Sequence, residues 1–192
     1  MKLTNHHKSI AIKIILFVLT AILFGGAIIG SQLLRDNPDI LTIIESFGYV
    51  GVFVAAVVSG LSVAAPIPAA TLTPLFTAAG LTVPAIIFFL ALGTLVADTI
   101  GYAIGRLGRS VIPSGHPRMQ QFTERIANQH PALIILFVTS YAALIPLPNE
   151  LILIPLALCG VSWRLLIIPL LVGALIIQTL LVTGVSLLPT FI

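Results

Sequence analysis

The sequence has very few charged residues for its length. Asp, Glu, Lys and Arg make up 8% of its 192 residues, whereas an ordinary soluble domain carries roughly 25%. So few charges cannot cover the surface of a folded domain in water. The composition therefore excludes a soluble globular protein and indicates a chain that folds mostly within lipid.

Several kinds of chemistry are also missing. The single cysteine, Cys159, excludes an intramolecular disulfide, and its apolar surroundings favour a small buried side chain. No metal-ligand spacing, phosphate-binding glycine loop or nucleophile motif occurs, so we predict no enzymatic activity and no cofactor. The net charge of +3 lies in short segments between apolar runs, which fits membrane topology better than nucleic-acid binding.

What the sequence has instead is a set of long apolar runs. Hydrophobic residues make up 58% of the chain, and about 20 consecutive apolar residues are enough to span a bilayer. The first run, residues 14–34, follows a basic start and has the features of either a signal peptide or a retained helix; its length favours a retained helix. The other runs are residues 47–80, 83–104, 131–160 and 165–188, of which the first and third are broken by prolines.

Charged residues between the runs predict the orientation. Residues 35–45 are acidic with a single arginine, whereas residues 106–130 contain four arginines and one glutamate. Because Lys and Arg favour cytoplasmic loops, we expect segment 106–130 and the N-terminus inside and segment 35–45 outside. Trp163 and Arg164 are interpreted as interfacial anchors.

The chain contains an internal repeat with an offset of 80 residues. This offset places Pro66 and Pro68 on Pro146 and Pro148, and it also superimposes Gly80 on Gly160 and Gly93 on Gly173. Prolines and glycines fix special backbone conformations, so these matches carry more weight than apolar ones. Each unit is a broken apolar segment followed by a complete transmembrane helix.

The repeat and the topology together predict the fold. Segments 47–80 and 131–160 must each begin and end on one side of the membrane, which makes them re-entrant hairpins with limbs of about 15 residues, or some 22 Å. The four prolines at 66, 68, 146 and 148 would form the tips. We predict one all-α integral membrane domain over residues 1–192. It would consist of an extra N-terminal helix (1–34), a first repeat (47–105), a cytoplasmic loop (106–130) and an inverted second repeat (131–188).

Two carboxylates at membrane depth are the main candidates for function. Glu150 follows Asn149 at the second tip, and Asp98 lies within the span 83–104. Burial in lipid favours the neutral form of a carboxyl group, so such groups can exchange protons near neutral pH. The alternatives are structural: Asn149 or Glu150 would cap the next helix, and Asp98 would pair with Arg106 or with polar groups of the other repeat. The 80-residue offset places Asp98 on Gln178.

Glycines predict where helices approach closely. Gly93, Gly101, Gly105 and Gly108 give the span 83–104 and the residues after it a face of small side chains. We expect this face to pack against another helix.

The segment from Gly93 to Arg106, with Asp98, Gly101, Tyr102 and Gly105, resembles the DedA or VTT-domain (SNARE-associated) membrane protein family. The Pro-x-Pro tips, the glycine about 12 residues after each and the basic loop are similar to that family, over roughly residues 47–185. The resemblance implies inverted re-entrant hairpins, a plasma (inner) membrane location and movement of polyprenyl-phosphate or phospholipid between leaflets, as a flippase or scramblase. Asp98 and Arg106 match the motif of that family, and Glu150 resembles its hairpin-tip carboxylate. We expect proton coupling through Glu150 and Asp98, with Arg106 and Asn149 as headgroup-binding residues.

Two differences from that family keep other functions open. The first tip has Ala69 and Ala70 where the family usually has a glutamate, and no arginine occurs between His130 and Trp163. The alternatives are a small-solute or multidrug exporter, for which a cation suits the carboxylate, and a membrane-organising protein without transport. The partners expected are membrane lipid, protons and a second copy of the chain in a homo-oligomer.

Overall fold

The protein is helical throughout the part of the chain that can be described. The computed structural model describes residues 22–62, 67–111, 126, 129–145 and 147–187, and no strand occurs within these ranges. Three of the described helices are long and apolar enough to cross a membrane: α2 (Pro38–Leu61), α4 (Val83–Val111) and α8 (Trp163–Leu187). The shorter elements are Ile22–Leu34, η1 (Ala69–Leu72), α3 (Thr73–Ala78), α6 (Pro131–Leu144) and α7 (Glu150–Leu158).

Helix α2 begins earlier than the sequence analysis predicted. Residues 35–45 were expected to be an external turn, but Asn37 caps the helix and Pro38 is its first residue. The Asn37 side chain accepts hydrogen bonds from the amides of Asp39 and Ile40, which satisfies donors at the helix start. The helix then breaks at Gly48, whose φ of 52° and ψ of −138° are non-helical. The predicted limb of the hairpin corresponds only to the part after this break.

Helix α4 extends further than predicted at its C-terminal end. The predicted span stopped at residue 104, whereas the helix continues to Val111 and takes up the first part of the predicted loop 106–130. Arg106 and Arg109 therefore lie on the last turns of a helix. Basic residues are favourable there because the C-terminal end of a helix carries a partial negative charge.

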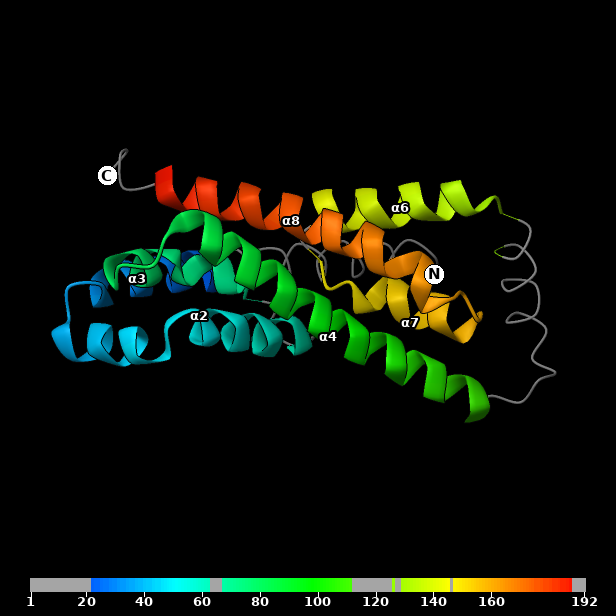
Figure 1. Cartoon of the computed structure of the whole chain (residues 1–192), viewed down its shortest axis with the longest axis horizontal. Coiled ribbons are helices and arrows are strands. Elements are labelled where there is room, and N and C mark those ends of the chain that lie inside the picture. The colour runs from blue at the N-terminus through cyan, green and yellow to red at the C-terminus, as the bar shows by residue number, and fades with distance from the viewer. Residues whose placement is uncertain (1–21, 63–66, 112–125, 127–128, 146, 188–192) are drawn as a thin grey trace, which may run out of the picture.

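The two longest helices, α4 and α8, pack against each other and against elements from both halves of the chain. Helix α4 contacts α2 and α7, and α8 contacts α6, η1 and α3. The two helices run in opposite directions along the long axis of the molecule (Figure 1). Each half of the chain therefore covers a long helix that belongs to the other half.

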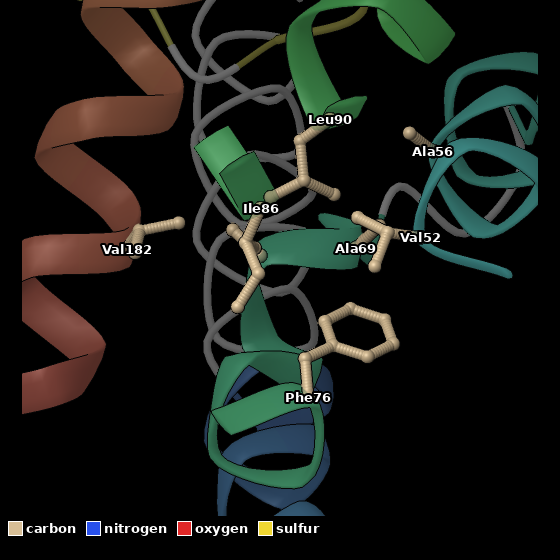
Figure 2. Packing of buried hydrophobic residues seen from close by; sticks show 8 residues of the cluster. Val52, Ala56, Ala69, Phe76, Ile86, Leu90 and Val182 are labelled. Carbon is tan, nitrogen blue, oxygen red and sulfur yellow. The ribbon is translucent and has the colours of Figure 1, made fainter. Parts of the chain in front are cut away.

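The hydrophobic core consists of two clusters. In the first, buried residues of α2, η1, α3 and α4 meet Val182 of α8, as Figure 2 shows. The second joins α6, α7 and α8 through side chains that include Val138, Leu153 and Leu166. Large apolar side chains such as Leu33, Val50 and Leu107 are exposed on the outside of the bundle, as expected for a surface solvated by lipid.

Glycines allow the predicted close approach between helices. A Cβ atom at Gly93 of α4 would lie 2.5 Å from Cβ of Ala56 in α2, and one at Gly173 of α8 would lie 2.5 Å from Cβ of Ala142 in α6. A Cβ at Gly105 would lie 2.8 Å from Cβ of Ala157 in α7. The prediction that glycines of α4 permit packing against another helix is confirmed at these contacts.

The turns before α4 and α8 have the same backbone hydrogen bonds 80 residues apart. Gly80 and Gly160 have φ values of 78° and 84°, a region that favours glycine because it lacks Cβ. The amide of Leu81 donates to Phe76 O at 3.0 Å, and that of Val161 donates to Leu156 O at 3.1 Å. Both turns are thus Schellman-type helix ends with glycine in the left-handed position.

The N-terminal helix and the proline tips are only partly described. The described part of the predicted first helix, Ile22–Leu34, is helical, and Ser31 Oγ donates a 2.8 Å hydrogen bond to Thr71 O of η1. Pro68 and Pro148 are described, whereas Pro66 and Pro146 lie outside the described residues.

Candidate functional site

A small cavity with both polar and apolar lining residues lies between the two halves of the chain. Its volume is about 120 Å³. Residues from both proline-containing turns line it, namely Pro68 and Ala69 from the first and Pro148, Asn149 and Glu150 from the second. The remaining polar groups come from Ser59, Ser62, Thr94, Asp98 and Gln178. The cavity therefore brings together Asp98 and Glu150, the two carboxylates singled out in the sequence.

Asp98 is buried and bonded to the second turn. Its side chain is 2% exposed, and its Oδ2 accepts a 3.1 Å hydrogen bond from Nδ2 of Asn149. The sequence allowed two structural partners for Asp98, namely Arg106 and a polar group of the other half of the chain. The partner is the second of these, because Asp98 is bonded to Asn149. Arg106 makes no ion pair with Asp98 in the described structure and is exposed at the far end of α4.

Glu150 is also buried, at the first residue of α7. It is 6% exposed, and a Cβ atom at Gly101 of α4 would lie 2.9 Å from its Cγ. The absence of a side chain at Gly101 therefore makes room for Glu150. The glycine face of α4 thus has a second role, because it admits a carboxylate next to the cavity.

Asn149 does not cap α7 with its side chain. Its carbonyl oxygen accepts from the amides of Ile152 and Leu153, and Pro148 O accepts from Leu151. The Asn149 side chain makes no capping bond, and its Nδ2 donates to Asp98. The capping role that the sequence allowed for Asn149 is thus performed by its backbone.

Gln178 of α8 faces the same cavity. It is 7% exposed, and its Nε2 donates a 3.1 Å hydrogen bond to Oγ1 of Thr94 in α4. The Thr94 hydroxyl in turn donates to Leu90 O, which fixes the Gln178 amide with nitrogen toward Thr94. Its Oε1 is buried without a hydrogen-bond partner. The residue matched to Asp98 by the 80-residue offset is therefore part of the same site.

A hydroxyl group from the preceding helix fixes each turn. Ser59 Oγ of α2 donates to Ile67 O at 2.6 Å and accepts from the amide of Ala69 at 3.2 Å. Tyr141 of α6 donates to Pro148 O at 3.4 Å. Within a membrane, irregular backbone would need such partners because water is absent there. Ser59 and Thr94 carry no specific signal in the sequence, since serine and threonine are common in helices.

A larger apolar groove adjoins the cavity on the side of the first turn. It has a volume of about 880 Å³ and lies between the Ile22–Leu34 helix, α2, η1 and α3. Ser59, Ser62, Pro68 and Ala69 line both spaces. The cavity and the apolar groove are therefore neighbours with a common wall.

Two other polar residues, Tyr102 and His130, do not line the cavity. Tyr102 of α4 donates to Val161 O at 2.8 Å, and its ring centroid lies 5.0 Å from that of Trp163. His130 accepts from the amide of Ala132 at the start of α6. No cluster of three metal-ligating side chains occurs among the described residues.

Comparison with known proteins gives no relative to which the site can be compared. No protein-family model, curated protein or solved structure matches the chain. The chemistry of the site must therefore be argued from its own residues.

Proposed function

We propose that this protein is a membrane transporter that moves a lipid between the leaflets of the plasma membrane. The observation that carries the proposal is the cavity shared by the two proline-containing turns, into which Asp98 and Glu150 project from opposite halves of the chain. Buried carboxylates in lipid are costly and are usually kept for function. A structural role alone does not require both of them to face the same space.

The proposed architecture is an inverted repeat with two re-entrant hairpins. The matching glycine turns at Gly80 and Gly160 support it, as do the opposite directions of α4 and α8 (Figure 1). The exchange of contacts, with α7 on α4 and η1 and α3 on α8, is what a two-fold axis in the membrane plane would produce. In this arrangement the N-terminus is cytoplasmic.

The proposed mechanism is alternating access around the cavity. A polar headgroup enters between the turns while its hydrocarbon chain stays in the apolar groove or in the bilayer. Protonation of Glu150, together with Asp98, removes negative charge from the cavity and changes the relative stability of the inward-open and outward-open states. The apolar helix surfaces then keep the rest of the lipid in a hydrocarbon environment throughout.

The proposal is tested by lipid movement in liposomes. The purified protein is reconstituted with a trace of fluorescent phospholipid, and a membrane-impermeant reductant bleaches the accessible leaflet under an imposed pH difference. Glu150→Gln is expected to abolish the proton-dependent fraction of lipid movement while retaining the helical circular dichroism spectrum. Glu45→Gln is the matched control, because Glu45 is an exposed carboxylate of α2 away from the cavity.

Two outcomes would contradict the proposal. Unchanged lipid movement in Glu150→Gln would eliminate the proton role of this carboxylate. The absence of any lipid movement by the unmodified protein, in liposomes where it is folded and inserted, would eliminate the transport function itself.

A further inference from the structure

The cavity offers more hydrogen-bond acceptors than donors. Both of its side-chain amides direct an N–H group at a protein atom, Asn149 at Asp98 and Gln178 at Thr94. Ser59 and Thr94 use their hydroxyl protons on backbone carbonyls. Each amide keeps one further N–H group, and the acceptors that remain are the carboxylates of Asp98 and Glu150 and the side-chain oxygens of Asn149 and Gln178.

The Gln178 oxygen is the most informative of these acceptors. A buried polar atom without a hydrogen-bond partner is uncommon and costs free energy. Oε1 of Gln178 is such an atom, and the residue is only 7% exposed. The bond of Nε2 to Thr94 fixes the orientation of the amide. The unpartnered oxygen therefore belongs to a residue that lines the cavity.

The 80-residue offset explains why this oxygen has no partner. Asp98 of α4 is bonded to Asn149 of the second turn. The same offset places Gln178 on Asp98 and Ala69 on Asn149, so the position that would supply a donor to Gln178 is an alanine. Ala69 and Gln178 both line the cavity. At these matched positions the second half has a hydrogen-bond donor, Asn149, whereas the first half has the methyl group of Ala69.

An anionic group has little to bind in this cavity. None of its described lining residues is Arg, Lys or His. The amides of Leu151, Ile152 and Leu153 at the start of α7 already donate to Pro148 and Asn149, so the helix start offers few free donors to a phosphate. The two carboxylates would also repel an anion while either is ionised.

We propose that the cavity binds the primary ammonium group of an amine-bearing amphiphile, whose hydrocarbon chain lies in the adjoining apolar groove. The ammonium has three donors, and Gln178 Oε1 and the carboxylates of Asp98 and Glu150 supply acceptors. Charge-assisted bonds of this kind are short and strong. The groove fits the chain because Ser59, Ser62, Pro68 and Ala69 line both spaces. This inference rests on the proposed transport function, since it names the class of molecule carried.

Binding to the purified full-length protein tests the inference without requiring transport. Three radiolabelled probes with the same twelve-carbon chain are compared by equilibrium dialysis in non-ionic detergent, with protein-free micelles as the blank. They are dodecylammonium, dodecyltrimethylammonium and dodecyl phosphate. The primary ammonium is expected to bind at least tenfold more tightly than the other two, because only it carries both the positive charge and the donors.

Two variants separate hydrogen bonding from charge. Gln178→Leu removes the free acceptor, and Ala69→Asn places a donor where the second half has Asn149. Each is expected to weaken dodecylammonium binding by roughly tenfold, the value of one hydrogen bond to a charged group. Neither changes the net charge of the cavity, so binding of dodecyltrimethylammonium should be unaffected. Glu45→Gln is expected to leave the binding of all three probes unchanged.

The outcomes distinguish this inference from the proposed transport function. Three results would overturn the ammonium site. They are equal binding of the three probes, tightest binding of dodecyl phosphate, and unchanged dodecylammonium binding in both variants while circular dichroism shows them folded. Selective dodecylammonium binding, weakened in either folded variant, would support it even if liposome assays detect no lipid movement. Lipid movement without any preference for an amine would retain transport and overturn the ammonium site.

Discussion

Asn149 and Asp98 are 51 residues apart in the sequence, yet the Asn149 side chain donates a 3.1 Å hydrogen bond to the buried Asp98 carboxyl group. This bond joins helix α4 to the turn that precedes α7. It also holds one of the two carboxylates of the cavity in place, so its loss should affect both stability and function.

Asn149→Ala should destabilise the protein, because it removes the side-chain donor of a buried carboxyl group. We expect the free energy of unfolding to fall by roughly 1.5–3 kcal/mol, the range for hydrogen bonds to charged groups. The measurement is unfolding in mixed micelles with increasing sodium dodecyl sulfate. A double-mutant cycle with Asp98→Ala isolates the pair, and a coupling energy below about 0.5 kcal/mol would show that the bond is energetically unimportant.

Gly93→Ala should disrupt the packing of α4 on α2. The new Cβ would lie 2.5 Å from both Cβ of Ala56 and the backbone oxygen of Phe53, and such overpacking costs about 1–3 kcal/mol. Gly184→Ala is the matched control in α8, because nothing lies within 4 Å of a Cβ at that position. Equal unfolding free energies for the two variants would contradict the packing of these helices.

Cysteine labelling should place the two ends of the bundle on opposite sides of the membrane. In a Cys159→Ala background, Asp36→Cys lies before α2, where Asp36 is 86% exposed, and Gln129→Cys lies at an exposed position before α6. A membrane-impermeant maleimide added to intact cells should label only the first. Labelling of both from outside would rule out the inverted arrangement, and with it the proposed position of the cavity.

The sequence predicted the membrane character and the special glycines but not the helix ends. Apolar length predicted α4 and α8 but not α2, which begins in a segment interpreted as a turn. Gly80 and Gly160 were singled out by the 80-residue offset, and both have the positive φ that favours glycine. The start of α2 was missed although Asn37 and Pro38 form a typical helix start. The acidic segment 35–45 was interpreted as a turn, whereas Asn37 is a helix cap and the residues from Pro38 onward are helical.

The sequence predicted several residues of the candidate site but not the groups to which they bond. Scarcity of charge singled out Asp98 and Glu150, and the offset added Gln178, which all line one cavity. The pairing of Asp98 was left open, since spacing along a helix favours Arg106 as much as a distant residue. Ser59 and Thr94 gave no signal, because their roles depend on carbonyls and amides that only the folded backbone brings near them.

The exchange of contacts between the halves has a consequence for biosynthesis. One side of α4 is covered by α2, which is made before it, but the side with Gly101 and Gly105 is covered by α7, which leaves the ribosome some 40 residues later. Until then the small-residue face of α4 has no partner within its own half. Insertion machinery or neighbouring lipid must shield that face, and a chain terminated after Val111 should be degraded rather than accumulate as a stable half-protein.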